Sequence, residues 1–144
     1  MRFDENSSAA IKGMALLFNR MLELYKELGI TKSKLTRLTL DMVLPDADSP
    51  HQNFPCLSTA VKAAETRYLL PVIFALLNEY SDGCEHHVQR SLVLKYLMDF
   101  YTVMDSCDVV PSVTEGTTMR DSVHNFLVTY QTCGSWAHEQ GLLL

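Results

Sequence analysis

Glycine and proline are scarce in this chain of 144 residues, which contains six glycines and five prolines. Both residues interrupt helices, glycine through its conformational freedom and proline through its missing N–H group, so their scarcity favours an all-α fold. Hydrophobic residues make up 47% of the chain, which is enough to offset the entropy lost on folding. We therefore expect a single helical domain, either complete in itself or part of a larger protein.

The chain also lacks an export signal and a long apolar run. Its first residues, MRFDENSS, are polar and acidic, and no apolar signal segment follows them. The most apolar run, residues 68–77, is shorter than the roughly 20 helical residues that cross a bilayer. These features predict a cytoplasmic protein without a membrane-spanning segment. No CxxC pair is present, so we expect buried, unpaired thiols at Cys56, Cys84, Cys107 and Cys133.

Positive charge is scarce in the second half of the chain. Residues 73–144 contain three Lys or Arg and nine Asp or Glu, a net charge of −6, whereas residues 1–72 contain nine and eight, a net charge of +1. An acidic surface repels phosphate, so we expect a basic protein partner and no nucleic acid. The one basic cluster, Lys32, Lys34 and Arg37, is interpreted as the solvated start of a helix.

Apolar periodicity predicts four main helices, at residues 8–28, 58–80, 84–106 and 117–140. Gly29 provides a left-handed residue to end the first of them. The second is apolar on every side between residues 68 and 77, which is typical of the central helix of a bundle. Pro71 predicts a kink or a break in it. The chain is therefore interpreted as a bundle of four helices.

The predicted helices carry apolar residues three and four positions apart, which indicates one buried face on each. In the first helix these residues are Ile11, Met14, Ala15, Phe18, Met21, Leu22, Tyr25 and Leu28. In the last helix they are Met119, Val123, Phe126, Leu127, Tyr130, Cys133, Gly134 and Ala137. We expect both sets to face the interior.

Two segments have weaker patterns. Residues 33–44 fit either a short helix or an irregular segment, because an isolated strand would find no partner in this sequence. Residues 45–57 contain three prolines and several turn-forming residues, which predicts a loop. Asp82 and Glu85 have the spacing of a capping box at the start of the third main helix.

The densest group of potential metal ligands is Cys84, His86 and His87. A closed structural zinc site needs four ligands, so others would have to join, such as Asp82, Glu85 or His138. Adjacent helical residues point about 100° apart, which sends the two imidazoles to different faces. An exposed helix start with one packed histidine is therefore the simpler interpretation, and no cofactor is expected.

A second group of charged side chains lies on the predicted second helix: Lys62, Glu65 and Arg67. Lys62 and Glu65 are one turn apart and can form an ion pair. The apolar surroundings could leave Arg67 partly buried, paired with a carboxylate or in contact with a ligand anion. Lys62 and Arg67 are therefore candidates for an anion contact.

The chain contains no nucleophile elbow, phosphate-binding loop or dinucleotide fingerprint. No motif ties it to a known family. Candidate interface residues are Trp136 and the terminal Leu142, Leu143 and Leu144, because tryptophan is common in binding hot spots and the chain ends on an apolar run. We expect a non-enzymatic helical interaction domain that binds another protein or self-associates. The alternative is a helical bundle, including an enzyme, that binds a metal or small ligand through the two groups described above.

Overall fold

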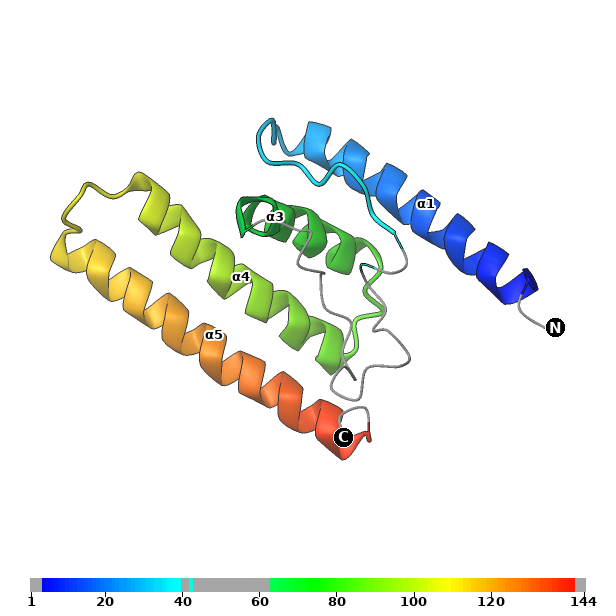
Figure 1. The fold of residues 1–144 in the computed structure, drawn as a ribbon. Coiled ribbons are helices and arrows are strands. Elements are labelled where there is room, and N and C mark those ends of the chain that lie inside the picture. Colours follow the sequence, from blue (N-terminus) through cyan, green and yellow to red (C-terminus); the bar gives the residue numbers. More distant parts are fainter. Residues whose placement is uncertain (1–3, 40–41, 43–62, 142–144) are drawn as a thin grey trace. The chain divides into compact units, whose positions relative to one another are not determined.

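The computed structural model describes residues 4–39, 42 and 63–141 of the chain (Figure 1). Over these residues the protein is all-helical, with no strand, and contains α1 (Asp4–Glu27), α3 (Ala63–Glu79), α4 (Glu85–Ser106) and α5 (Val113–Glu139). The all-α prediction with four main helices is confirmed. None of these four helices is long and apolar enough to cross a membrane. The predicted loop at 45–57, Cys56, and the first residues of the helix predicted at 58–80 lie outside the described residues.

The chain divides into two compact units, residues 1–72 and 73–144. The boundary falls within α3, between Val72 and Ile73. This helix continues through the proline. The predicted break therefore does not occur at Pro71. From Leu69 to Leu77 every side chain of α3 is buried or half-buried, as its all-round apolar sequence predicts.

The end of α1 follows from its sequence. Gly29 has a positive φ of 66°, a conformation that costs glycine little. Its N–H donates to the carbonyl of Lys26 at 3.1 Å, and the N–H of Ile30 donates to that of Tyr25 at 2.9 Å. These two bonds form a Schellman motif, which satisfies the last carbonyls of the helix. The predicted glycine end is therefore confirmed, although α1 begins at Asp4, before the predicted position.

The core of the first unit gathers at the last turns of α1. After Gly29 the chain folds back, and the N–H of Leu35 donates to the buried hydroxyl of Tyr25 at 3.2 Å. Burial raises the pKa of Tyr25, the Leu35 bond opposes this, and nearby Glu65 adds to the increase. Among the described residues of this unit, the buried side chains are Met21, Leu24, Tyr25, Leu35, Met42, Leu69 and Val72.

The predicted inner face of α1 is correct in part. Met21 and Tyr25 are buried, but Ile11, Leu22 and Leu28 are exposed. Ile11 lies in an earlier turn, away from the returning segment, which covers only one side of the last turns. Ala15 is exposed as well. Leu24, which is 3% exposed, was missing from the predicted set.

The segment after α1 is irregular. Residues 31–39 form no helix, so the irregular alternative for the first part of 33–44 is correct. Lys32, Lys34 and Arg37 are exposed on this segment. The cluster is solvated as expected, but it does not begin a helix.

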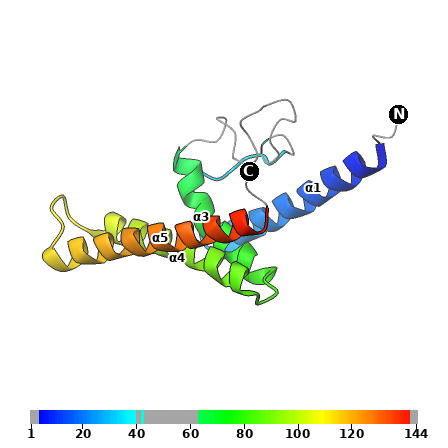
Figure 2. The ribbon, with the colours of Figure 1, turned by 90° about the horizontal axis from the view of Figure 1, so that it is seen from below.

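In the second unit α4 and α5 lie antiparallel and side by side, joined by residues 107–112 (Figures 1 and 2). The end of α3 is linked to α4 by a hydrogen bond, which the hydroxyl of Ser91 donates to the side-chain oxygen of Asn78 at 3.1 Å. Packing between α4 and α5 is shallow. No side chain of α4 is fully buried, and Ser122 alone is buried in α5.

A capping box sets the start of α5. Ser112 Oγ accepts a hydrogen bond from the N–H of Glu115 at 3.2 Å, and Glu115 Oε2 accepts one from the N–H of Ser112 at 2.8 Å. Hydrogen bonds from the hydroxyl and the N–H of Ser112 lower the pKa of Glu115. The helix therefore starts at Val113, before the predicted residue 117, and the Ser-x-x-Glu spacing is the signal that would have located it.

Candidate functional site

A tight turn leads from α3 into α4. Gly83 has a positive φ of 75°, which allows the chain to reverse, and its N–H donates to Ser81 Oγ at 3.2 Å. Residue Cys84 is the N-cap of α4, but its side chain makes no capping hydrogen bond. The turn thus places a thiol at the helix start without using it to cap the helix.

The carboxylate of Asp82 points back over this turn. Its Oδ1 accepts a hydrogen bond from the N–H of Cys84 at 2.9 Å and lies 2.9 Å from His87 Nδ1. Hydrogen bonds from the backbone N–H and thiol of Cys84 lower the pKa of Asp82, and the charge that His87 carries when it is protonated lowers it further. The predicted Asp82–Glu85 capping box is wrong, because the carboxylate of Asp82 accepts its hydrogen bond from the N–H of Cys84, and the N-cap is Cys84, two residues after Asp82.

Three different ligand types therefore converge at the start of α4. The carboxylate of Asp82, the thiol of Cys84 and the imidazole of His87 each offer one atom, and these atoms lie within 4.8 Å of one another. Asp82 and Cys84 are exposed and His87 is half-buried. Contrary to expectation, Cys84 is not a buried thiol. It is free, as are Cys107 and Cys133, which are half-buried.

His86 points away from this cluster and packs against α5. Its ring stacks on that of Trp136, with centroids 3.7 Å apart and planes 17° apart. Its Nε2 is buried and has no hydrogen-bond partner among the described residues. Burial lowers the pKa of His86, and the positive charges of Arg90 and His87 add to this.

The structure therefore divides the predicted group of Cys84, His86 and His87. Two members converge, the third joins the contact between α4 and α5, and Asp82 takes its place. The 100° between adjacent helical residues was the signal for this separation. His138, another suggested ligand, is exposed on α5.

The other predicted site residues are placed less favourably for a ligand. Glu65 and Arg67 are half-buried on α3, and each already has an interaction partner. Lys62 lies outside the described residues, and so do the terminal leucines 142–144. Trp136 contacts His86 within the same unit, so the contact that the structure shows for it is intramolecular.

An exposed apolar stripe runs along α5, on a side of the helix that does not face α4. Val123, Leu127 and Tyr130 are 38%, 56% and 63% exposed. They are spaced by four and three residues and thus share one face. We call these three residues the α5 outer stripe. The expectation that they face the interior is wrong, since Met119, Phe126 and Cys133 occupy the more buried side.

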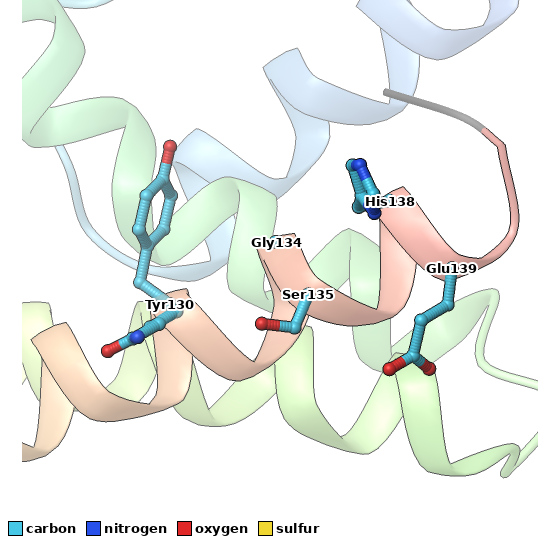
Figure 3. A pocket seen from close by; sticks show the side chains of 6 residues that line it. Tyr130, Gly134, Ser135, His138 and Glu139 are labelled. Carbon is cyan, nitrogen blue, oxygen red and sulfur yellow. The ribbon is translucent and has the colours of Figure 1, made fainter. Parts of the chain in front are cut away.

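The stripe ends in an open hollow on α5. Tyr130 and His138 project on the same side of the helix, on either side of Gly134, while Ser135 and Glu139 point elsewhere (Figure 3). Nothing lies within 4 Å of the position that a Cβ at Gly134 would occupy. The glycine therefore leaves space between two larger side chains.

No family model matches the chain, and no curated protein or solved structure matches it either. Function therefore has to be inferred from geometry. Two features stand out among the described residues: the α5 outer stripe, which sequence reasoning assigned to the interior, and the ligand cluster at the start of α4, which it identified in part.

Proposed function

We propose that this protein is a helical interaction module that binds an amphipathic helix along the α5 outer stripe. The observation that carries the proposal is the exposure of Val123, Leu127 and Tyr130 on one face of a helix whose other side already packs against α4. Apolar side chains at spacings of three and four residues match the face of a second helix, which presents the same spacing. The hollow at Gly134 continues this face and can accept a side chain from the partner.

The size of the stripe indicates a weak interaction. Its three side chains are already partly covered, so their complete burial contributes roughly 3–6 kcal/mol in total. Association costs about 4–15 kcal/mol in lost translational and rotational freedom. The stripe therefore supports binding only when further contacts join it. The net charge of −6 in residues 73–144 favours a partner helix with basic residues at its edges.

Self-association is the form of this proposal that can be measured without a second protein. Because two copies both carry the net charge of −6 in residues 73–144, the measurement is made at high salt, which screens their repulsion. Sedimentation equilibrium at concentrations up to about 1 mM would detect association even at a binding free energy near −4 kcal/mol. We expect the average mass to rise with concentration. Leu127→Asp should hold the protein as a monomer, because it places a charge in the middle of the stripe.

Val128→Asp is the matched control. Val128 is 51% exposed, close to the 56% of Leu127, but it points about 100° away around the helix. It should associate like the wild type. A protein that stays monomeric throughout the series, or an equal effect of both substitutions, would contradict self-association through the stripe.

A further inference from the structure

The cluster at the start of α4 has the donor atoms of a transition-metal site. Cys84 and His87 are three residues apart, which places them on the same side of the first helical turn. The left-handed Gly83 turns the preceding chain back, so that Asp82 reaches them. The three donor atoms lie within 4.8 Å of one another. Tetrahedral Zn²⁺ at bond lengths of about 2.0–2.3 Å needs ligand atoms about 3.3–3.8 Å apart. Asp82 Oδ1 and His87 Nδ1, which lie 2.9 Å apart, must therefore separate slightly, and any pair near the 4.8 Å limit must close.

We propose that Asp82, Cys84 and His87 bind one Zn²⁺ ion. This site goes beyond the proposed helix-binding function and does not depend on it. A thiolate, an imidazole nitrogen and a carboxylate oxygen are the three ligand types that Zn²⁺ accepts. Ca²⁺ and Mg²⁺ prefer oxygen ligands alone, so the thiol and the imidazole select against them.

The exposure of the cluster leaves room for a fourth ligand. The side chain of Asp82 is 67% exposed and that of His87 is 28% exposed, so water can complete the tetrahedron from the solvent side. His86 does not take this position, because its ring is stacked on Trp136. Three protein ligands and one open position are the arrangement of zinc sites that exchange a water or bind a further ligand.

Binding couples to one proton. The Cys84 S–H bond breaks, its proton goes to solvent, and the thiolate forms the Zn–S bond. The carboxylate of Asp82 binds through an oxygen, and His87 binds through the lone pair of Nδ1, without any change of oxidation state. The hydrogen bond that the thiol donates to Asp82, and the one that His87 Nδ1 accepts from the N–H of Asp82 at 3.3 Å, are replaced by bonds to the metal.

Titration calorimetry of Zn²⁺ into the reduced, tag-free chain tests this site. We expect one ion per chain and the release of about one proton, obtained from buffers of different ionisation enthalpy. Cys84→Ser and His87→Ala should each weaken the affinity by at least about tenfold, since each removes one of three ligands. Cys107→Ser and His124→Ala, which lie outside the cluster, should bind like the wild type.

Co²⁺ gives a measurement on the wild type that does not depend on the folding of any variant. We expect a thiolate-to-cobalt charge-transfer band that Zn²⁺ displaces. The proposal is overturned if this band is absent, if Zn²⁺ binds without proton release, or if Cys84→Ser and His87→Ala bind as tightly as the two controls.

Discussion

The first unit and the α4–α5 hairpin are built differently, although both are helical. The last turns of α1 bury Met21, Leu24 and Tyr25 to 3% exposure or less. In the hairpin α4 has no fully buried side chain, and Ser122 is the one buried residue of α5. The first unit encloses side chains because the chain folds back over α1, whereas two helices side by side can cover each other on one face only.

This difference indicates where the molecule gains stability and where it can gain a partner. Fully buried side chains contribute most to folding, about 1.5–3 kcal/mol each for Leu or Met. Half-exposed ones, such as Leu127 and Tyr130, still have apolar area that another surface can cover. The first unit should therefore be sensitive to core substitutions, and the hairpin to substitutions that change its surface or its helix ends.

A pair of leucine substitutions gives the largest expected effect. Leu24→Ala should lower the free energy of unfolding of its unit by about 2–5 kcal/mol, because Leu24 is 3% exposed and leaves a cavity. Leu97→Ala in α4 should cost less than half as much, because Leu97 is only half-buried. Urea denaturation followed by far-UV circular dichroism compares them.

The single tryptophan makes this comparison sharper. Trp136 stacks on His86 within the hairpin, so its fluorescence follows the unfolding of that unit. We expect Leu97→Ala to shift the fluorescence transition more than Leu24→Ala does. If the two substitutions lowered the free energy of unfolding equally, the hairpin would have a core as well packed as that of the first unit.

Tyr25→Phe tests the polar contact that closes the first unit. The substitution keeps the ring but removes the oxygen that accepts a hydrogen bond from the buried N–H of Leu35. An unpaired buried donor costs about 1–3 kcal/mol. Hydrogen exchange should show faster exchange at Leu35 and at the end of α1, with little change in α5. Unchanged exchange at Leu35 would show that this bond does not hold the returning segment.

Ser112→Ala should have the smallest effect. It removes the hydroxyl that caps α5, which costs about 0.5–2 kcal/mol, and Trp136 fluorescence during urea denaturation measures the loss. Ser112→Thr retains the hydroxyl and should behave like the wild type. A loss of equal size in both variants would assign the effect to packing instead of capping.

The difference in stability between the wild type and Ser112→Ala should also depend on pH. The pKa of Glu115 in the folded protein lies below its ordinary value of 4.5, since Ser112 donates hydrogen bonds to the carboxylate. The ionised carboxylate of Glu115 therefore adds to the free energy of unfolding above pH 4.5, and this contribution is lost as the pH falls through the pKa of the folded protein. The stability difference between the wild type and Ser112→Ala should therefore narrow below about pH 4.5. A constant difference would contradict this role of Glu115.

Helix existence and several helix ends were readable in the sequence because they depend on neighbouring residues. The Schellman motif at Gly29 uses hydrogen bonds that span only five residues. The Ser112–Glu115 capping box is equally local, and its Ser-x-x-Glu spacing locates the start of α5 four residues before the predicted residue 117. The ligand cluster was partly readable for the same reason, since Cys84 and His87 are separated by one helical turn.

Which side of each helix is covered was decided by the tertiary structure. Periodicity predicted that Val123, Leu127 and Tyr130 lie on the inner face of α5. The single neighbouring helix α4 covers only a narrow strip of α5, and these three side chains lie outside that strip. Burial of Leu24 likewise depends on the returning segment around Leu35. The separation of His86 from His87 completes this division: helical geometry predicts that they diverge, and only the position of Trp136 on α5 determines which one is left to join Asp82 and Cys84.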